Sequence, residues 1–389
     1  MTPVSAAPSV ALLLNPIDAV IAMPSFSSLV RLASPLCLGV VAACSRTPGV
    51  STAVTPAATP AAQPASTPTG VTDGDVRRLL GALAADSMEG RGTATPGSAR
   101  AATFIAAELA RYGVQPAGDS GFYQRVPVAF RSRNGVRELT LLSALAARDS
   151  VPAADRANAV NVVGLIPGSD PALRDQVVLI DAHYDHLGIR HDQSGDSIYN
   201  GADDDASGVV AVMEIARALA AGPPPKRTVV VAATTGEEVG LLGTRWYIEH
   251  PARPLDAMVA NLEIEMIGRP DSLAGGPGRG WLTGFERSTM GDLFTNAGLP
   301  IVADKRLDQQ FFMRSDNIAF AERGIVAHTL SSYNMHNDYH EPSDDVAHID
   351  FAHMTQLVDI AVRAARLLAD SPTKLQWKPG GQPAPRNRE

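Results

Sequence analysis

Five short segments carry acidic residues and histidines of the types that bind metal ions. They are residues 181–186, 200–208, 234–240, 263–268 and 336–344. Each segment borders a run of residues whose pattern predicts a strand or a helix. Imidazole nitrogens and carboxylate oxygens without any thiolate suit a pair of zinc ions joined by a bridging carboxylate. Each segment alone is a modest signal, but together they predict a metal site.

The first two segments place a histidine near several acids. His183 ends an apolar run, and Asp185 fits a carboxylate that orients a metal-binding imidazole. A surface loop is the alternative. Asp203, Asp204 and Asp205 are consecutive, and like charges this close repel one another unless a cation neutralises them. An acidic helix N-terminus, which complements the helix dipole, is the alternative there.

The other three segments add carboxylates and a dense loop. Glu237 and Glu238 follow an apolar strand, where one carboxylate can bind a metal while its neighbour acts as general base. A solvated turn is the alternative. Glu263 and Glu265 share one face of a predicted strand, and the pattern alone does not choose between them. Residues 336–344 hold two histidines with Asp, Tyr and Glu, a density that favours a site over a single structural histidine.

Alternating strands and helices must position these segments. The predicted strands are residues 159–166, 176–182, 228–234, 258–264 and 325–330. The predicted helices are residues 71–85, 97–112, 206–221, 241–250, 287–297 and 351–369. The strands are continuously apolar, as expected when helices cover both faces of a sheet, so we predict one α/β domain over 71–370. In such sheets the binding crevice lies at the carboxyl ends of the strands. The polar tail 371–389 is expected to be loosely ordered.

Composition limits the class of protein further. The chain has 389 residues, of which 45% are hydrophobic and 19% charged, as in soluble globular proteins. A formal net charge of −8 argues against nucleic acid as a partner. The body of the chain has no apolar run long enough for a polytopic membrane protein. Cys37 and Cys44 both precede the predicted domain, which excludes a disulfide framework, a thiolate zinc site and a cysteine nucleophile inside it.

The N-terminus is typical of an exported lipoprotein. Within 1–44, Arg31 precedes a short apolar run that ends in VAAC at Cys44, and Met23 is a possible true start. Lipidation of Cys44 would leave the protein in the cell envelope, in the periplasm or on the outer membrane, attached only through an acyl anchor. A plain cleaved signal peptide is the alternative. Residues 45–70 are rich in Ala, Pro, Ser and Thr, which predicts a flexible linker.

The motifs HYDHLG, GADDDASG, TTGEEVGLLG, EMIGR and DYHEPSDD occur in this order within about 80–370. As an ordered set they resemble the zinc peptidase family of bacterial leucyl aminopeptidase, aminopeptidase Y and glutamate carboxypeptidase. The upstream stretch DSMEGRGTATPGSARAATFIAAEL is also similar to that family. The resemblance implies a mixed, mostly parallel central sheet flanked by helices on both faces, and two zinc ions per chain.

The resemblance also implies a ligand set. The metal ligands would be His183, Asp204, Glu238, Glu265 and His340. His183 and Glu265 would bind one zinc, Glu238 and His340 the other. Asp204 would bridge the two, and the peptide bond after it is expected to be cis.

Further roles follow from the same resemblance. Glu237 matches the general base, Asp185 the orienter of the first histidine, and Tyr339 a residue that stabilises the tetrahedral intermediate in some members. The sequence departs from the family twice. Glu265 stands where an Asp is usual, which adds a methylene, and RSDN at 314–317 resembles a segment that usually ends in His.

The implied activity is a zinc-dependent aminopeptidase acting on peptides with a free N-terminus, in which Glu237 takes a proton from a metal-activated water. Glutaminyl cyclase is an alternative, although the five-ligand set argues against it. A carboxypeptidase for acidic C-terminal residues is another, which a basic patch at the pocket would favour. A receptor-like domain without activity is the third, but it would have lost Glu237 or several ligands. Residues 130–158 are too few for an inserted protease-associated domain, so a single catalytic domain with an open cleft is expected.

Overall fold

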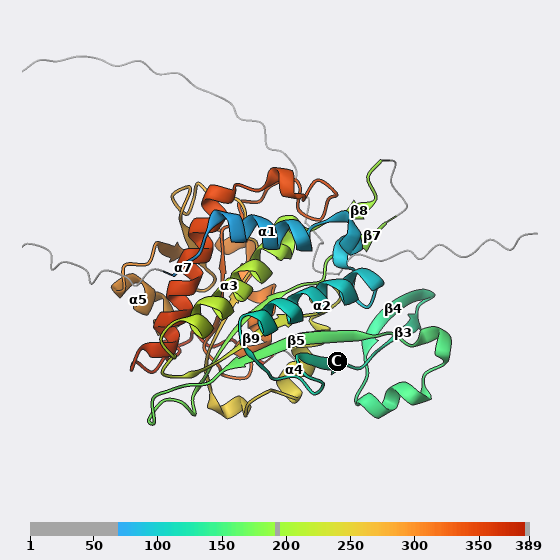
Figure 1. Cartoon of the computed structure of the whole chain (residues 1–389), viewed down its shortest axis with the longest axis horizontal. Coiled ribbons are helices and arrows are strands. Elements are labelled where there is room, and N and C mark those ends of the chain that lie inside the picture. Colours follow the sequence, from blue (N-terminus) through green and yellow to red (C-terminus); the bar gives the residue numbers. More distant parts are fainter. Residues whose placement is uncertain (1–68, 191–194, 386–389) are drawn as a thin grey trace, which may run out of the picture. The chain divides into compact units, whose positions relative to one another are not determined.

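The computed structural model describes residues 69–190 and 195–385 (Figure 1). The predicted signal segment 1–44 and nearly all of the linker lie outside the described residues. Within the described ranges no helix is both long and apolar enough to cross a membrane.

One mixed sheet forms the centre of the described part of the chain. Its strands are β1 (Gln115–Pro116), β2 (Tyr123–Val126), β5 (Ala159–Ile166), β6 (Val177–His183), β9 (Thr228–Thr234), β10 (Met258–Ile264), β11 (Gly280–Leu282), β12 (Ile301–Ala303) and β13 (Ala327–Ser331). Their order is β1-β5-β9-β6-β10-β13-β11-β12, and β2 pairs with β5. Strands β9, β6, β10 and β13 are parallel, whereas β5 is antiparallel to β9 and β11 to β13. The five strands predicted from apolar runs are the five central ones.

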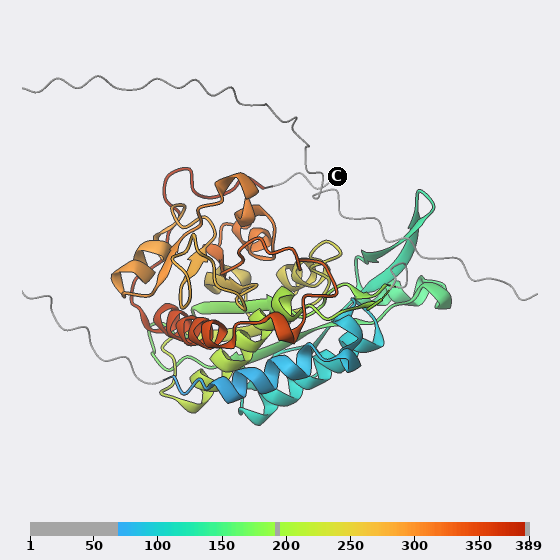
Figure 2. The ribbon, with the colours of Figure 1, turned by 90° about the horizontal axis from the view of Figure 1, so that it is seen from above.

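Helices cover both faces of this sheet, which confirms the predicted fold class (Figure 2). They are α1 (Asp73–Leu83), α2 (Pro96–Arg111), α3 (Gly208–Ala221), α4 (Leu242–Glu249), α5 (Thr289–Asn296), α6 (Asn317–Ala321) and α7 (Phe351–Asp370). Side chains alternate along β6: Ile180 packs in one core with α1, α2, α3 and α7, and Leu179 in a second core with α4 and α6. Helix starts follow capping side chains, since the hydroxyl of Thr95 accepts from Ser98 N and the carboxylate of Asp350 from His353 N.

The strand register brings the polar segments to one edge. In the parallel pairs, Asp181 of β6 lies opposite Glu263 of β10, and His183 lies opposite Thr234 of β9. The residues that follow these strands therefore meet at the carboxyl edge of the sheet.

Short elements were not predicted from the sequence. Strands β3 (Val128–Arg133) and β4 (Val136–Leu141) form a hairpin beside the sheet, as Figure 2 shows, and β7 (Gly188–Ile189) pairs with β8 (Ile198–Tyr199). Single helical turns are η1 (Asp86–Arg91), η2 (Leu145–Ser150), η3 (Ala153–Asp155), η4 (Ala202–Ser207), η5 (Leu255–Ala257), η6 (Leu307–Gln309), η7 (Phe311–Met313) and η8 (Val346–His348). The two-residue strands and single turns are too short to show a hydrophobic period, and the six-residue strands β3 and β4 do not alternate between buried and exposed residues.

The expectation of a loose C-terminal tail needs correction for residues 371–385. Leu375 is buried in the larger core, and Gln376 accepts a hydrogen bond from Thr289 N at 2.9 Å. The indole of Trp377 donates to Gly324 O at 3.0 Å. Two apolar side chains thus hold a mostly polar, Pro- and Gly-rich segment against the domain.

Candidate metal centre

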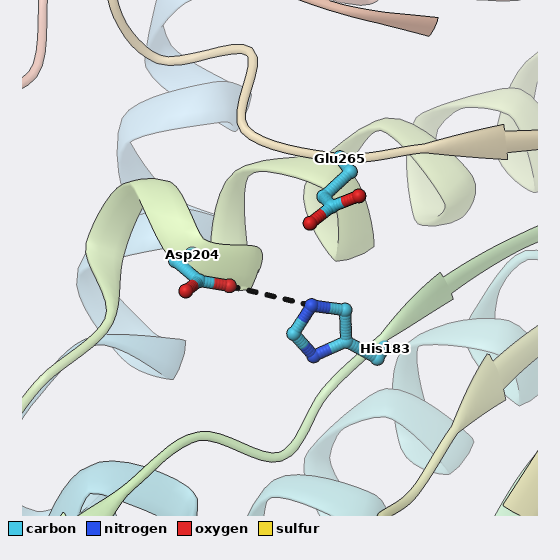
Figure 3. A group of neighbouring side chains, drawn as sticks. All are labelled: His183, Asp204 and Glu265. Carbon is cyan, nitrogen blue, oxygen red and sulfur yellow. Dashed lines mark ion pairs between the residues drawn. The ribbon is translucent and has the colours of Figure 1, made fainter. Parts of the chain in front are cut away.

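The structure brings the five predicted ligands to the carboxyl edge of the sheet. Two groups of side chains offer ligand atoms that lie within 4.8 Å of one another in each group. One group contains His183, Asp204 and Glu265, and Figure 3 shows these side chains converging from three different segments. The other contains His186, Asp204 and Glu238. Asp204 belongs to both groups, as a bridging ligand would.

Asp204 lies between imidazoles. Its Oδ1 is 3.3 Å from His183 Nε2, and its Oδ2 is 3.2 Å from His340 Nε2. Burial raises the pKa of Asp204, but these two histidines and His186 outweigh burial and hold the pKa well below its usual range. The peptide bond from Asp204 to Asp205 is cis, as the resemblance implied.

The two outer acids of the triplet have structural partners. Asp203 Oδ1 accepts a hydrogen bond from Gly268 N at 2.7 Å, and Asp205 Oδ1 accepts one from Met266 N at 3.0 Å. Both bonds tie turn η4 to the chain that leaves β10. Only Asp204 of the three is therefore directed at the candidate ligands.

The second group contains a residue that sequence reasoning missed. His186 Nδ1 lies 2.9 Å from Glu238 Oε1, while the predicted ligand His340 has its Nε2 3.3 Å from Glu238 Oε2. Burial and Asp204 raise the pKa of Glu238, but the two histidines outweigh them and lower it to about 2. The signal for His186 was its place three residues after His183 in the HYDH motif.

Asp185 does not orient His183 through its carboxylate, contrary to the prediction. The carboxylate is 3.9 Å from His183 Nδ1, whereas the backbone carbonyl of Asp185 is 3.1 Å from that nitrogen. The carboxylate instead accepts hydrogen bonds from Thr93 Oγ1 at 2.7 Å and Glu237 N at 3.2 Å. A proton on Nδ1, facing the carbonyl, leaves Nε2 free as a metal ligand.

The structure distinguishes Glu265 from Glu263. Glu265 lies in the first metal group, and burial followed by the charge of Glu263 raises its pKa to about 8. Glu263 is fully buried and accepts four hydrogen bonds from protein donors. These donors are Ser315 Oγ, Asp316 N at 3.1 Å, Asn317 N at 3.0 Å and Thr329 Oγ1 at 2.7 Å. The RSDN segment at 314–317 thus holds Glu263.

The predicted base and the predicted tyrosine lie beside the ligands. Burial raises the pKa of Glu237 well above its usual range, helped by the charges of Glu238 and Glu265 and opposed by that of His183. The ring of Tyr339 stacks on His340, with centroids 3.9 Å apart. Burial and the nearby carboxylates raise the pKa of Tyr339, so its hydroxyl stays protonated and can donate.

The donors present fit zinc. His183 Nε2, His186 Nδ1 and Glu238 Oε1 are buried, and none makes a well-directed hydrogen bond within the described chain. Buried polar atoms are rarely left without a partner, because the desolvation of each costs free energy. Imidazole nitrogens and carboxylate oxygens at this spacing are zinc ligands, and bound cations would satisfy these atoms.

Buried Arg91 supports the segments that carry the ligands, and sequence reasoning missed it too. Its guanidinium donates to a backbone carbonyl next to His183, Tyr184 O at 2.8 Å. It also donates to two carbonyls just before turn η4, Asn200 O at 2.5 Å and Gly201 O at 2.7 Å. Its position in the EGRG stretch of η1 was the only signal. Arg91 fixes the approach of the 184–186 segment to turn η4.

The loop that carries His340 is anchored in a similar way. Asp344 accepts hydrogen bonds from Asp203 N and Asp204 N, both at 3.0 Å. Arg269 forms ion pairs with Asp338 and Asp344, at 2.5 Å and 3.4 Å. These contacts hold the loop against the segment of Asp204.

Sheet and site together define the class of the protein: an α/β protein with two overlapping groups of metal ligands at the carboxyl edge of its sheet. Residues 161–365 match the family model of peptidase family M28, and the chain belongs to that family. A search of curated proteins gave no match.

Solved zinc-exopeptidase structures share the fold. A zinc aminopeptidase from Bacillus subtilis superposes with a TM-score of 0.57 at 14% identity, over 78% of this chain and 97% of that one. The aminopeptidase from Aneurinibacillus sp. strain AM-1 gives 0.54 at 16% identity, over 82% and 98%. The Legionella pneumophila LapA aminopeptidase gives 0.54 at 18%, over 77% and 73%. Family membership and the ligand groups support a zinc peptidase.

Proposed function

We propose that the protein is a two-zinc aminopeptidase that removes N-terminal residues from peptides. The observation that carries the proposal is the pair of metal-ligand groups that share Asp204, with the carboxylate of Glu237 beside them. A structural metal site would need the ligands but not Glu237.

His183, Asp204 and Glu265 would hold one zinc ion, and Asp204, Glu238 and His340 the other, with His186 against Glu238. When bound, the zinc ions lower the pKa of a bound water and polarise the scissile carbonyl.

The chain's own groups would move the proton. Glu237 accepts a proton from the water and delivers it to the leaving amine. The hydrogen bond from its backbone N–H to Asp185 holds this part of the turn after β9. The Tyr339 hydroxyl, held beside His340 by ring stacking, would donate to the oxyanion.

Four carboxylates converge at this edge: Asp204, Glu237, Glu238 and Glu265. Two bound zinc ions would balance their charge, so the net charge of the site does not by itself select a free α-ammonium group. The choice of an aminopeptidase is supported by the zinc aminopeptidases whose fold this chain shares.

Hydrolysis of aminoacyl-p-nitroanilides tests the proposal. We expect zinc-dependent release that a chelator abolishes and that Glu237→Gln lowers by about 100-fold or more. Glu286→Gln is the matched control, because the side chain of Glu286 is 64% exposed. Failure of the zinc-loaded protein to cleave any free-amine substrate would reject the aminopeptidase function.

We also propose export with a lipid anchor at Cys44, which rests on the VAAC sequence. Cells fed a labelled fatty acid should label the full-length protein but not its Cys44→Ser variant. Labelling of both would reject the anchor at this residue.

A further inference from the structure

Aromatic rings lead from the candidate metal centre to a single arginine. We call Trp281, Phe311, Tyr333 and Tyr339 the aromatic wall. Successive ring centroids in that order are 5.3, 5.8 and 5.4 Å apart, and Tyr339 stacks on His340. The wall therefore begins at a proposed zinc ligand and continues to Phe311.

Arg314 lies beside Phe311, the second ring of this wall counted from Trp281. Its guanidinium carbon is 5.3 Å from the centre of the Phe311 ring, and the side chain is half-buried. Two other arginines nearby are paired with acids: Arg306 with Asp271 at 2.6 Å, and Arg269 with Asp338. Within the described residues, the Arg314 guanidinium forms neither a hydrogen bond nor an ion pair, and it lies over the Phe311 ring.

The backbone next to Arg314 is fixed to the strand that leads to the metal centre. Asp316 N and Asn317 N donate to Glu263 at 3.1 and 3.0 Å. Glu263 is two residues before the proposed ligand Glu265 on β10. Arg314 is thus anchored beside the centre and is not part of a free loop.

The charge of Arg314 reaches the groups around the site. Burial, followed by the charge of Asp204, raises the pKa of Tyr333 to about 12, and the charge of Arg314 acts in the opposite direction. The ring of Tyr333 lies 5.8 Å from the Phe311 ring and 5.4 Å from the Tyr339 ring, so it joins the ring beside Arg314 to the ring beside His340. The wall contains a second donor without an acceptor, because the buried indole nitrogen of Trp281 has no hydrogen-bond partner within the described chain.

We propose that Arg314 binds a carboxylate of the peptide substrate, which gives the enzyme a preference for substrates with a carboxylate close to the scissile bond. The inference rests on the proposed function and names its substrate class. The metal centre would hold the amino end of the substrate, and the guanidinium beside Phe311 offers the forked donor geometry that a carboxylate accepts. One residue spans only about 3.5 Å, so the length of the peptide sets how far its carboxylate can lie from its α-ammonium group.

Two sources of the carboxylate share this chemistry: the C-terminal α-carboxylate of a short peptide and an acidic side chain after the scissile bond. Leu-Gly tests the first, and Leu-Asp-amide tests the second. Leu-Gly-amide has neither carboxylate and serves as the reference substrate.

Kinetics of the zinc-loaded enzyme with these three substrates test the proposal. In Arg314→Gln we expect kcat/KM for a carboxylate-bearing substrate to fall about 10- to 100-fold, mostly through KM, with less than about threefold change for Leu-Gly-amide. Arg314→Lys should restore part of the loss. Arg137→Gln is the matched control, because Arg137 also stacks on a phenylalanine, with 3.9 Å to the Phe130 ring, but on the β3–β4 hairpin.

Equal losses on all three substrates would overturn the proposal, because they would indicate a structural role for Arg314. Unchanged kinetics would overturn it as well. Calorimetric binding of Leu-Gly and Leu-Gly-amide to zinc-loaded Glu237→Gln, with and without Arg314→Gln, needs no turnover. An inactive wild type would then reject the aminopeptidase function, while a carboxylate-dependent binding difference would still support the role of Arg314.

Discussion

Two pairs of polar residues at neighbouring strands differ in the hydrogen-bond donors that surround them. Asp181 and Glu263 lie opposite each other on β6 and β10, and we call them the inner pair. His183, the last residue of β6, and Glu265, the first residue after β10, follow two residues later, and we call them the edge pair. Glu263 accepts four hydrogen bonds, and Asp181 accepts one from Asn261 Nδ2 at 2.6 Å. Within the described residues, His183 Nε2 of the edge pair has no well-directed hydrogen-bond partner.

The difference indicates that neighbouring donors, and not residue type, separate a structural acid from a candidate metal ligand. Glu263 is satisfied by hydroxyl and backbone N–H groups, so a cation is not required there. At the edge, Glu265 lies with His183 and Asp204 in one group of candidate metal ligands. A dication satisfies several such groups at once.

The largest expected effect is the loss of the shared ligand of the edge site. Asp204→Asn removes the charge that both ligand groups use, and we expect kcat/KM to fall on the order of 1,000-fold, since metal ions supply several kcal/mol of transition-state stabilisation. Kinetics and zinc content by mass spectrometry measure the effect. Asp203→Asn is the matched control, because the amide oxygen can still accept from Gly268 N. Full zinc content in Asp204→Asn would contradict the assignment.

Substitution in the inner pair should lower stability and leave zinc binding intact, the opposite of the result expected at the edge site. Glu263→Ala leaves four donors without their acceptor, and we expect a loss of about 3 kcal/mol in the free energy of unfolding, measured in urea. The folded fraction should retain its zinc. Glu263→Gln keeps one acceptor oxygen and should lose less. A variant of normal stability that has lost zinc would show that Glu263 acts at the metal centre.

Removal of metal by a chelator tests whether zinc binds at the edge site and stabilises the folded protein. A ligand that binds only the folded state, present at 100 times its Kd, stabilises by about 2.7 kcal/mol, so we expect a chelator to lower the free energy of unfolding by about this amount. The same chelator should change the stability of Asp204→Asn much less. A wild-type transition that is insensitive to both zinc and chelator would contradict binding at the edge site.

The smallest expected effect is the contribution of Glu108, which pairs with two surface arginines, to the free energy of unfolding. Burial raises the pKa of Glu108, but hydrogen bonds from Arg111, Arg78 and Tyr112 outweigh burial and lower it to about 2. Because the folded pKa is depressed, this stability is present above the unfolded value near 4.5 and is lost as the pH falls towards 2. The arginines are 43% and 55% exposed, so the contribution is discounted to about 1 kcal/mol.

Acid titration of unfolding checks this prediction. The difference in stability between wild type and Glu108→Gln should shrink between pH 5 and pH 2. A constant difference over this range would contradict the ion-pair explanation.

Much of the site could be predicted from the sequence, because the motifs follow the apolar strands in a fixed order. Strand β10 was predicted with its observed bounds, and helix α7 within one residue. The role of Asp185 was wrong in detail, since neither Thr93 nor the backbone of Glu237 is visible as its donor in a sequence pattern. Distant partners of this kind are set by tertiary contacts.

The sequence by itself determined the fold class, the central strands and the types of donor at the sheet edge, because hydrophobic periodicity and residue chemistry are local properties. Only the tertiary structure decided which acids face one another. It separated Asp204 from its two neighbours and Glu265 from Glu263, and it placed His186 against the candidate ligand Glu238. The physical reason is that a carboxylate's role depends on the donors around it, and folding brings those donors from remote parts of the chain.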